Sequence, residues 1–533
     1  MGKKNLIDGI RNIIISNLHV LLLLLLLIPF YYILYKIYIP KLAAFGCFDD
    51  CFNYVGGYFI ANGKHIYKDF FFNHQLIPPL ISYFIQEITN PINIYDLLLK
   101  HRQFLMLFGL FFNALLILRF KSPAFLFVLF YELSKFYIFG DRFLAEGMIV
   151  YPVVYLFGIC LLKLTKQKTF TIDYILSGIF TWFIVFSREP YIPLVIFLFI
   201  VILWGKQNLI KKISILIFTV LSALTLLYIS DLKEYFFNIV TFNIKGVINA
   251  EPKTNLFGPK IFHIFFYPIY VLLFGEPNIF KNFLTGIDIL FLAFFAITFK
   301  KRNFALVLFI FLSLGLANFR VVTPDTIFYE AFHLINWFAL LLFSLFLLIF
   351  LYQKPKILKF TSLFLVFLIL FSLVFHKQYF GYEKKDIHPE FLTNYGYLLH
   401  TGEAVKVLSN NNNSLYLDGS EDLIYWQAKR MSSYKYVWYT SLMPKFEKYR
   451  SERIEMFRKT PPDFYVEFGV CPKNYNLTDG SLPGFVRDQY VRLYSGNDPT
   501  CVYVKKTKLK DINDIQWKKA GEFINNLNTK IIN

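Results

Sequence analysis

Long apolar runs separated by short basic or polar segments make up the first 375 residues of the chain. Runs such as 20–30, 339–351 and 360–375 are too apolar for a water-facing helix, and about 20 apolar residues suffice for a helix to cross a bilayer. A backbone in lipid must satisfy its own hydrogen bonds, so these runs predict transmembrane helices. The weak alternation typical of a membrane β-barrel is absent from the sequence.

Lys and Arg in the short loops orient the predicted helices, because cytoplasmic loops are rich in both residues. Lys3, Lys4 and Arg11 place the N-terminus in the cytoplasm. The first run is interpreted as a retained helix, because no small-residue cleavage site follows it. The pattern predicts about eleven spans, near 18–39, 102–119, 123–140, 147–162, 170–187, 191–204, 213–230, 283–299, 304–317, 333–352 and 360–375.

The loop 231–282 allows two interpretations. Its segment 260–274 is apolar enough to be a further span or a re-entrant element. A crossing there would place the basic run 300–302 outside, against the usual distribution of positive charge. We therefore expect a re-entrant or interfacial element, with the loops 40–100 and 231–282 on the outer face.

The remainder of the chain, 376–533, is polar and punctuated by Gly, Pro and Asn. The segments 405–419, 420–431 and 461–469 predict a helix end followed by a strand, a helix, and a second strand. The segment 490–506 predicts a hairpin, and 505–533 a basic helical tail. The predicted fold is therefore an α-helical polytopic membrane domain over 1–375, followed by a small extracytoplasmic α/β domain over 376–533.

Composition narrows the class of partner. The chain is 56% hydrophobic with a formal net charge of +19, which in a membrane protein favours anionic lipid and positive-inside anchoring over nucleic acid. Five Cys are too few for a disulfide scaffold or a zinc site. Two pairings, Cys47–Cys51 and Cys471–Cys501, stay open alongside free thiols.

Polar side chains that can carry chemistry gather at the predicted outer ends of the spans. An acidic pair, Asp49–Asp50, follows the first span and begins an aromatic loop. A carboxylate can act as general base toward a hydroxyl group, and Arg can hold a phosphate through two parallel hydrogen bonds. The other candidates are Lys68, Asp69, His74, Asp141, Arg142, Glu146, Arg188, Glu189, Arg320, Asp325, Tyr329, Glu330 and His333. Charges at membrane depth are costly, so we expect these groups to face a shared cavity suited to sugar transfer from a lipid phosphate.

Structural interpretations of the same residues stay open. Asp49 and Asp50 could simply cap an amphipathic helix over 52–62. The remaining candidates also have structural alternatives: Arg188 as an ion pair with Glu189, Arg142 as a partner of Asp141 or Glu146, His333 as a satisfied polar group, and Tyr329 as an interfacial belt residue.

The order of these features resembles the GT-C superfamily of polyprenyl-phosphate-sugar-dependent glycosyltransferases. Within it, the chain is similar to the branch of protein O-mannosyltransferases and lipid A aminoarabinose transferases. The resemblance covers most of 1–375 and rests on an acidic pair after the first span, a loop with Tyr67–Lys68–Asp69 and Pro78–Pro79–Leu80, many spans, and a terminal outer domain. The Lys that family members often carry before Pro-Pro-Leu is absent here, since His74–Gln75 occupy that stretch.

The resemblance implies a role for each candidate. Asp49 is expected to be the catalytic base, with Asp50 and Asp141 as further acids in the catalytic set. The donor phosphate is expected to meet Arg188 and Arg320, with Lys68 or His74 substituting for the missing Lys. The residues expected to position substrate are Glu146, Tyr329 and His333.

The resemblance implies an inverting glycosyltransferase in the cytoplasmic (inner) membrane, moving a sugar from a polyprenyl phosphate to a lipid, glycan or protein acceptor. No cofactor is required for that chemistry, and a divalent metal stays open. A lipid-linked glycan flippase and an O-antigen-type ligase or polymerase are the alternatives; a transporter should show charged groups at mid-span and inverted repeats. Sugar, acceptor, metal dependence and oligomeric state are not readable from the sequence.

Overall fold

The computed structural model describes residues 3–205, 208–248, 263–275, 277–318, 331–352, 356–376, 387–418, 423–438, 440, 442–468, 482–493 and 500–523. The chain divides into two compact units, each built from segments distant in sequence. The helical unit comprises Met1–Lys41, Arg102–Leu224 and Thr254–Lys385, and the mixed unit comprises Leu42–His101, Thr225–Lys253 and Asp386–Asn533. The loop 42–101 therefore belongs to the same compact unit as the C-terminal part of the chain.

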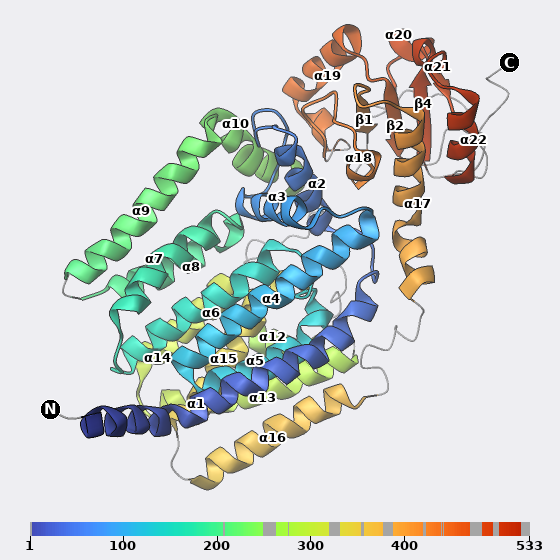
Figure 1. Cartoon of the computed structure of the whole chain (residues 1–533). Coiled ribbons are helices and arrows are strands. Elements are labelled where there is room, and N and C mark those ends of the chain that lie inside the picture. Colours follow the sequence, from blue (N-terminus) through green and yellow to red (C-terminus); the bar gives the residue numbers. More distant parts are fainter. Residues whose placement is uncertain are drawn as a thin grey trace. The chain divides into compact units, whose positions relative to one another are not determined.

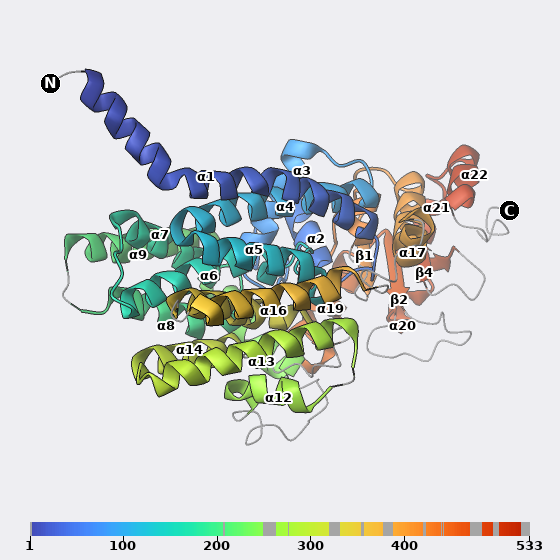
Figure 2. The same cartoon turned by 90° about the horizontal axis from the view of Figure 1, so that it is seen from below.

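The helical unit is a bundle whose long helices run side by side (Figures 1 and 2). Its helices are α1 (Lys3–Tyr38), α4 (Ile94–Phe120, from Arg102 on), α5 (Ser122–Ser134), α6 (Ala145–Leu164), α7 (Thr171–Val185), α8 (Ile192–Leu203), α9 (Leu209–Ile229, to Leu224), α12 (Tyr267–Leu273), α13 (Ile279–Lys300), α14 (Phe304–Ala317), α15 (Ile335–Leu351) and α16 (Lys356–Val374). Short 3₁₀ turns η2 (Lys135–Ile138), η3 (Glu189–Tyr191) and η5 (Ala331–Leu334) extend or precede these helices.

Every predicted span coincides with one of these helices. In the described part of the chain, seven helices are long and apolar enough to cross a membrane. The four shorter ones are α5, α7, α8 and α14. The spans containing α6 and α15 are each 89% buried, whereas the α1 span is 22% buried. The two buried helices therefore form the core of the bundle, and α1 presents apolar side chains outward, as a helix in lipid does.

The segment with two interpretations, 260–274, is described from residue 263 onward. It forms α12, a helix of seven residues, which at 1.5 Å per residue is about 10 Å long and too short to cross a bilayer. Tyr267 and Val271 of this helix are fully buried, and the ring of Tyr267 meets Trp337 of α15 edge-on at 4.8 Å. The described part thus packs against the core of the helical unit.

The mixed unit begins with a helix pair, α2 (Asp49–Ala61) and α3 (Ile77–Thr89). A side chain at Gly57 would place its Cβ 2.7 Å from the backbone nitrogen of Tyr83, and one at Gly56 would lie 2.9 Å from Pro79. The glycine pair therefore lets α3 approach the backbone of α2 directly. The pair is followed later in the chain by α10 (Leu232–Phe236) and the π-helix η4 (Phe237–Ile248).

The C-terminal part of the mixed unit carries a four-stranded sheet of order β1-β2-β4-β3. Strands β1 (Leu415–Asp418) and β2 (Phe464–Phe468) are parallel, and β4 (Thr500–Lys505) pairs antiparallel with β2 and with β3 (Tyr490–Arg492). The surrounding helical elements are α17 (Ile387–Leu408), α18 (Leu423–Ala428), η6 (Met443–Lys445), α19 (Glu447–Lys459), α20 (Gly484–Arg487), α21 (Lys506–Leu509) and α22 (Asp514–Phe523). The predicted strands and the antiparallel pairing of the hairpin are confirmed, as is the small α/β fold.

Candidate functional site

The acidic pair begins α2, and its two members have different surroundings. The Asp50 carboxylate is fully buried and accepts hydrogen bonds from the backbone N–H of Phe48 (3.0 Å) and the hydroxyl of Tyr54 (3.4 Å). It thereby satisfies a backbone donor at the helix start, where intrahelical acceptors are lacking. The expected capping interpretation is therefore correct for Asp50.

Asp49 is the more accessible acid. Its side chain is 26% exposed, and its Oδ2 lies 3.5 Å from Nε2 of His74. The imidazole of His74 stacks on the ring of Phe52, with centroids 6.3 Å apart. A disulfide joins Cys47 to Cys51 and so encloses both acids. The structure therefore presents one carboxylate beside an imidazole at a helix start whose backbone is covalently braced.

The loop that carries His74 is held by η4 and α10. Asn238 of η4 accepts a hydrogen bond from the Phe72 N–H at 2.7 Å, and Asn243 donates to the carbonyl of Asn73 at 2.8 Å. Tyr235 of α10 donates to the side-chain oxygen of Gln75 at 3.1 Å. These contacts are long-range in sequence and fix the position of His74. Lys68, predicted as a possible phosphate contact, is exposed on the preceding turn.

Three of the predicted residues meet in the helical unit. Glu146, at the start of α6, accepts from Nε of Arg188 at 2.7 Å, and Nδ1 of His333 lies 3.7 Å from the same carboxylate. Tyr191 donates to the backbone carbonyl of His333 at 3.2 Å, and Glu189 lies 4.0 Å from the Arg188 guanidinium. The structure thus brings Arg188, Glu146 and His333 into one buried cluster, and their role toward a substrate stays a prediction.

Asp141 forms an ion pair that the sequence did not suggest. Its partner is Arg102, near the N-terminal end of α4, which also donates to the Asp141 backbone carbonyl at 2.8 Å. The neighbouring Arg142 lies over the ring of Phe139 at 5.3 Å. The alternative pairing of Arg142 with Asp141 or Glu146 stays a prediction. Four further predicted residues lie outside the described part of the chain: Arg320, Asp325, Tyr329 and Glu330. Cys471, of the second predicted cysteine pairing, also lies outside it.

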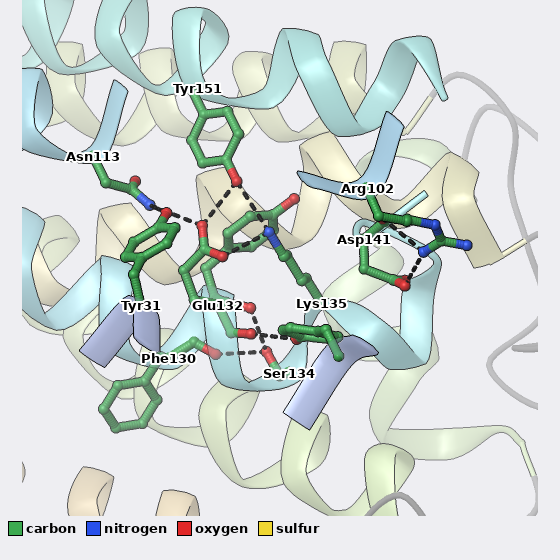
Figure 3. Close-up of polar contacts among 11 residues, drawn as sticks. Tyr31, Arg102, Asn113, Phe130, Glu132, Ser134, Lys135, Asp141 and Tyr151 are labelled. Atoms are coloured by element: carbon green, nitrogen blue, oxygen red, sulfur yellow. Dashed lines mark hydrogen bonds and ion pairs between the residues drawn. The ribbon is translucent and has the colours of Figure 1, made fainter. Parts of the chain in front are cut away.

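A second buried charge pair, also missed, lies in α5 and η2 (Figure 3). Lys135 Nζ is 2.6 Å from Oε2 of Glu132. The other oxygen, Oε1, accepts from Tyr151 and from Asn113, each at 2.8 Å, and Asn113 also donates to Tyr31 at 2.6 Å. Two charges inside a predicted span were a usable signal, because charges at that depth require partners.

The two buried pairs border one narrow cavity of about 10 Å³ within the helical unit. Its polar lining consists of Tyr31, Tyr38, Arg102, Glu132, Lys135 and Asp141, and its apolar lining of Leu34, Ile39, Leu105 and Met106. Within the described residues, no three acidic, His or Cys side chains come close enough to hold a metal ion. The cavity therefore has a partly polar lining and room for a water-sized molecule.

Comparisons with known proteins find a similar fold but no similar sequence. No protein-family model matches the chain, and no curated protein matches it. The crystal structure of ArnT from Cupriavidus metallidurans bound to undecaprenyl phosphate is similar to it, with a TM-score of 0.52 and 8% sequence identity. The match covers 90% of this chain and 97% of that chain. The chain is therefore a multi-pass membrane protein with the GT-C fold predicted from its sequence.

Proposed function

We propose that this protein is an inverting glycosyltransferase that takes a sugar from a polyprenyl phosphate. The supporting observation is the fold match to ArnT, which extends over nearly the whole of both chains and comes from a structure holding undecaprenyl phosphate. In this proposal the reaction occurs at the outer face of the cytoplasmic membrane, with the mixed unit outside. The acceptor is a lipid, glycan or protein.

Asp49 is the proposed general base. The hydroxyl oxygen of the acceptor attacks the anomeric carbon, its proton passes to the Asp49 carboxylate, and the bond from that carbon to the phosphate oxygen breaks. The lipid phosphate leaves with the electron pair of the broken bond. Because the acceptor oxygen attacks from the opposite face, the anomeric centre is inverted. Asp49 suits this role better than Asp50, because Asp50 is fully buried and already accepts two hydrogen bonds, whereas Asp49 is partly exposed. His74, 3.5 Å away, orients the carboxylate.

The departing phosphate needs positive charge. Arg188 and Arg320 are the proposed ligands, because a guanidinium matches the oxygens of a phosphate in two-pronged geometry. Glu146 holds Arg188 through its Nε atom at 2.7 Å, which fixes the plane of the guanidinium. In this proposal Glu146 and His333 position the guanidinium of Arg188. Asp141 positions the guanidinium of Arg102, with which it forms an ion pair.

The test separates Asp49 from Asp50 in the purified, full-length protein. We expect D49N to fold normally and to lose sugar transfer from a panel of undecaprenyl-phosphate sugars by about 10²-fold or more, the usual contribution of a general base. Undecaprenyl phosphate should still bind, as measured by native mass spectrometry. D50N should instead lower thermal stability, because it weakens a buried cap. Full transfer by a folded D49N protein would refute the assignment.

The D49N variant also distinguishes the proposed transferase from the transporter alternative. A flippase moves its lipid-linked glycan without deprotonating an acceptor, so D49N would leave translocation in proteoliposomes unchanged. Loss of transfer together with retained lipid binding is expected only for the enzyme.

A further inference from the structure

An open groove of about 590 Å³ lies entirely within the mixed unit, between η4 and the start of α19. Phe237 and Lys245 line it from η4, and Lys445, Phe446 and Lys448 line it from the other side, together with Glu447. Lys245 and Lys445 are exposed. The groove has the volume of a small-ligand site, which usually spans about 300–1,000 Å³.

Positive charge dominates this groove. The one carboxylate among the described lining residues, Glu447, pairs with Arg450. The lining residue Lys448 pairs with Glu234, which lies outside the lining and also pairs with Lys435. Burial raises the pKa of Glu234, but the hydrogen bonds and charges of the two lysines outweigh burial and hold that pKa below its usual value. Glu234 is therefore ionised at neutral pH and paired with Lys435 and Lys448. The positive charges of Lys245 and Lys445 stay in excess and can attract an anion.

Aromatic rings form the apolar wall. Phe237 and Phe446 meet edge-on with centroids 5.6 Å apart, and Lys448 Nζ lies 5.1 Å above the Phe237 ring. The face of an aromatic ring is electron-rich, and the C–H groups on one face of a sugar ring carry partial positive charge. Aromatic faces beside cations are therefore complementary to a saccharide that bears acidic groups.

A chain of contacts connects the groove to the loop beside Asp49. Phe446 packs on Phe242 of η4 at 5.7 Å, and Phe242 meets Phe71 at 4.8 Å. Phe71 belongs to the loop that η4 holds through hydrogen bonds and that carries His74, 3.5 Å from Asp49. A ligand in the groove thus rests on the same element that holds the loop of His74.

From this combination we propose that the groove binds an anionic glycan and is the acceptor site of the protein. The role as acceptor rests on the proposed transferase function, whereas the binding itself does not. The lysines supply charge, the two phenylalanines supply sugar-stacking surface, and η4 couples the bound glycan to the loop of His74.

The probe experiment uses the full chain in nanodiscs of neutral phosphatidylcholine. Binding of three soluble probes is measured by saturation-transfer difference NMR: trigalacturonate, glucose 1-phosphate, and neutral maltotriose. We expect at least one acidic probe to bind about fivefold to tenfold more tightly than maltotriose. K245Q/K445Q should abolish that preference, since two exposed charge contacts are lost, and added salt should weaken it.

K518Q/K519Q is the matched control, because it removes the same charge from exposed positions of α22 in the same unit. Equal binding of acidic and neutral probes, or an equal effect of the control, overturns the proposal. So does a K245Q/K445Q protein that loses only its attraction to anionic vesicles, which would mark the patch as a membrane contact.

The two proposals fail separately. A protein that binds the acidic probe but transfers no sugar retains the groove and refutes the transferase. A protein that transfers sugar yet shows no preference for acidic probes supports the transferase and refutes the groove as an anionic glycan site.

Discussion

The buried pair Glu132–Lys135 allows a quantitative test of how the helical unit is held together. Both side chains are almost inaccessible, at 0% and 4% exposure, and they lie 2.6 Å apart. Tyr151 and Asn113 saturate the second carboxylate oxygen, and Lys135 also lies within 3.3 Å of the Tyr151 hydroxyl (Figure 3). The pair therefore joins α5 and η2 to α4 and α6 through charge-assisted hydrogen bonds.

Removing one partner leaves the other charge without compensation. K135M leaves the Oε2 atom of Glu132 facing an apolar group, and we expect it to reduce the free energy of unfolding by about 3–5 kcal/mol. E132Q keeps an acceptor for Tyr151 and Asn113 but leaves the Lys135 ammonium with a hydroxyl and the Tyr38 ring, 5.8 Å away. Its cost should lie at the lower end of that range, about 3 kcal/mol.

The double variant E132Q/K135M removes both charges and retains the amide hydrogen bonds. Its destabilisation should therefore be smaller than the sum of the single effects by about 2–3 kcal/mol, the coupling energy of contacting groups. The assay is detergent-to-SDS unfolding of the full chain followed by tryptophan fluorescence. The pair Glu455–Lys459 on α19 is the control, since both side chains are more than half exposed and E455Q/K459M should leave the midpoint unchanged.

Two outcomes would contradict this account. If the single variants were as harmless as the surface control, the pair would contribute nothing to the bundle. If the single effects were simply additive, Glu132 and Lys135 would act independently rather than as a pair.

The remaining predictions concern the site and the mixed unit. R188A should raise the KM for the lipid donor about tenfold or more, as expected for a lost charged hydrogen bond, while R188K should fall between; unchanged donor dependence would exclude Arg188. C47S/C51S should lower the free energy of unfolding by about 2 kcal/mol, the loop-closure value for so short a loop, measured with and without reductant. Burial, and secondly Asp418, raise the pKa of Glu467 to about 7. The folded mixed unit therefore retains that proton longer than the unfolded chain, and its stability should fall as pH rises from about 4.5 to 7. E467Q should flatten this dependence of the melting temperature, whereas an unaltered slope would assign it to other groups.

Local patterns predicted the elements of this fold well, because each depends on residues close in sequence. The apolar runs located every helix of the bundle, and the alternation and turn residues of 461–469 and 490–506 located three strands of the sheet. The local patterns do not indicate which segments, distant in sequence, form one compact unit. The loop 42–101 and the segment 225–253 join the C-terminal part through contacts such as Phe71 N–H to Lys435 O at 2.8 Å, and no periodicity records such a pairing.

The candidate site shows the same division. The acids, Arg188 and His333 were recognisable as polar groups at the ends of apolar runs. Of their partners, the sequence suggested Glu189 for Arg188, which the structure confirms at 4.0 Å, but not Glu146 for Arg188 or Arg102 for Asp141. Asp141 has a cation beside it in sequence, Arg142, but pairs with Arg102, 39 residues away. Asp141 and Arg142 lie in a turn between η2 and α6, where proximity in sequence does not determine which ion pair forms.

The difference between Asp49 and Asp50 is the clearest case. In sequence they are two identical neighbours. The residues alone left capping and catalysis open for both, and only the family resemblance singled out Asp49 as the expected base. In the structure α2 begins at Asp49, so successive side chains diverge by about 100° around the helix axis. One carboxylate turns toward the Phe48 N–H and Tyr54, and the other toward His74. The capping interpretation therefore applies to the buried Asp50, and catalysis by the partly exposed Asp49 stays a prediction. The buried acid secures the helix start that presents Asp49, and the disulfide around them holds that arrangement.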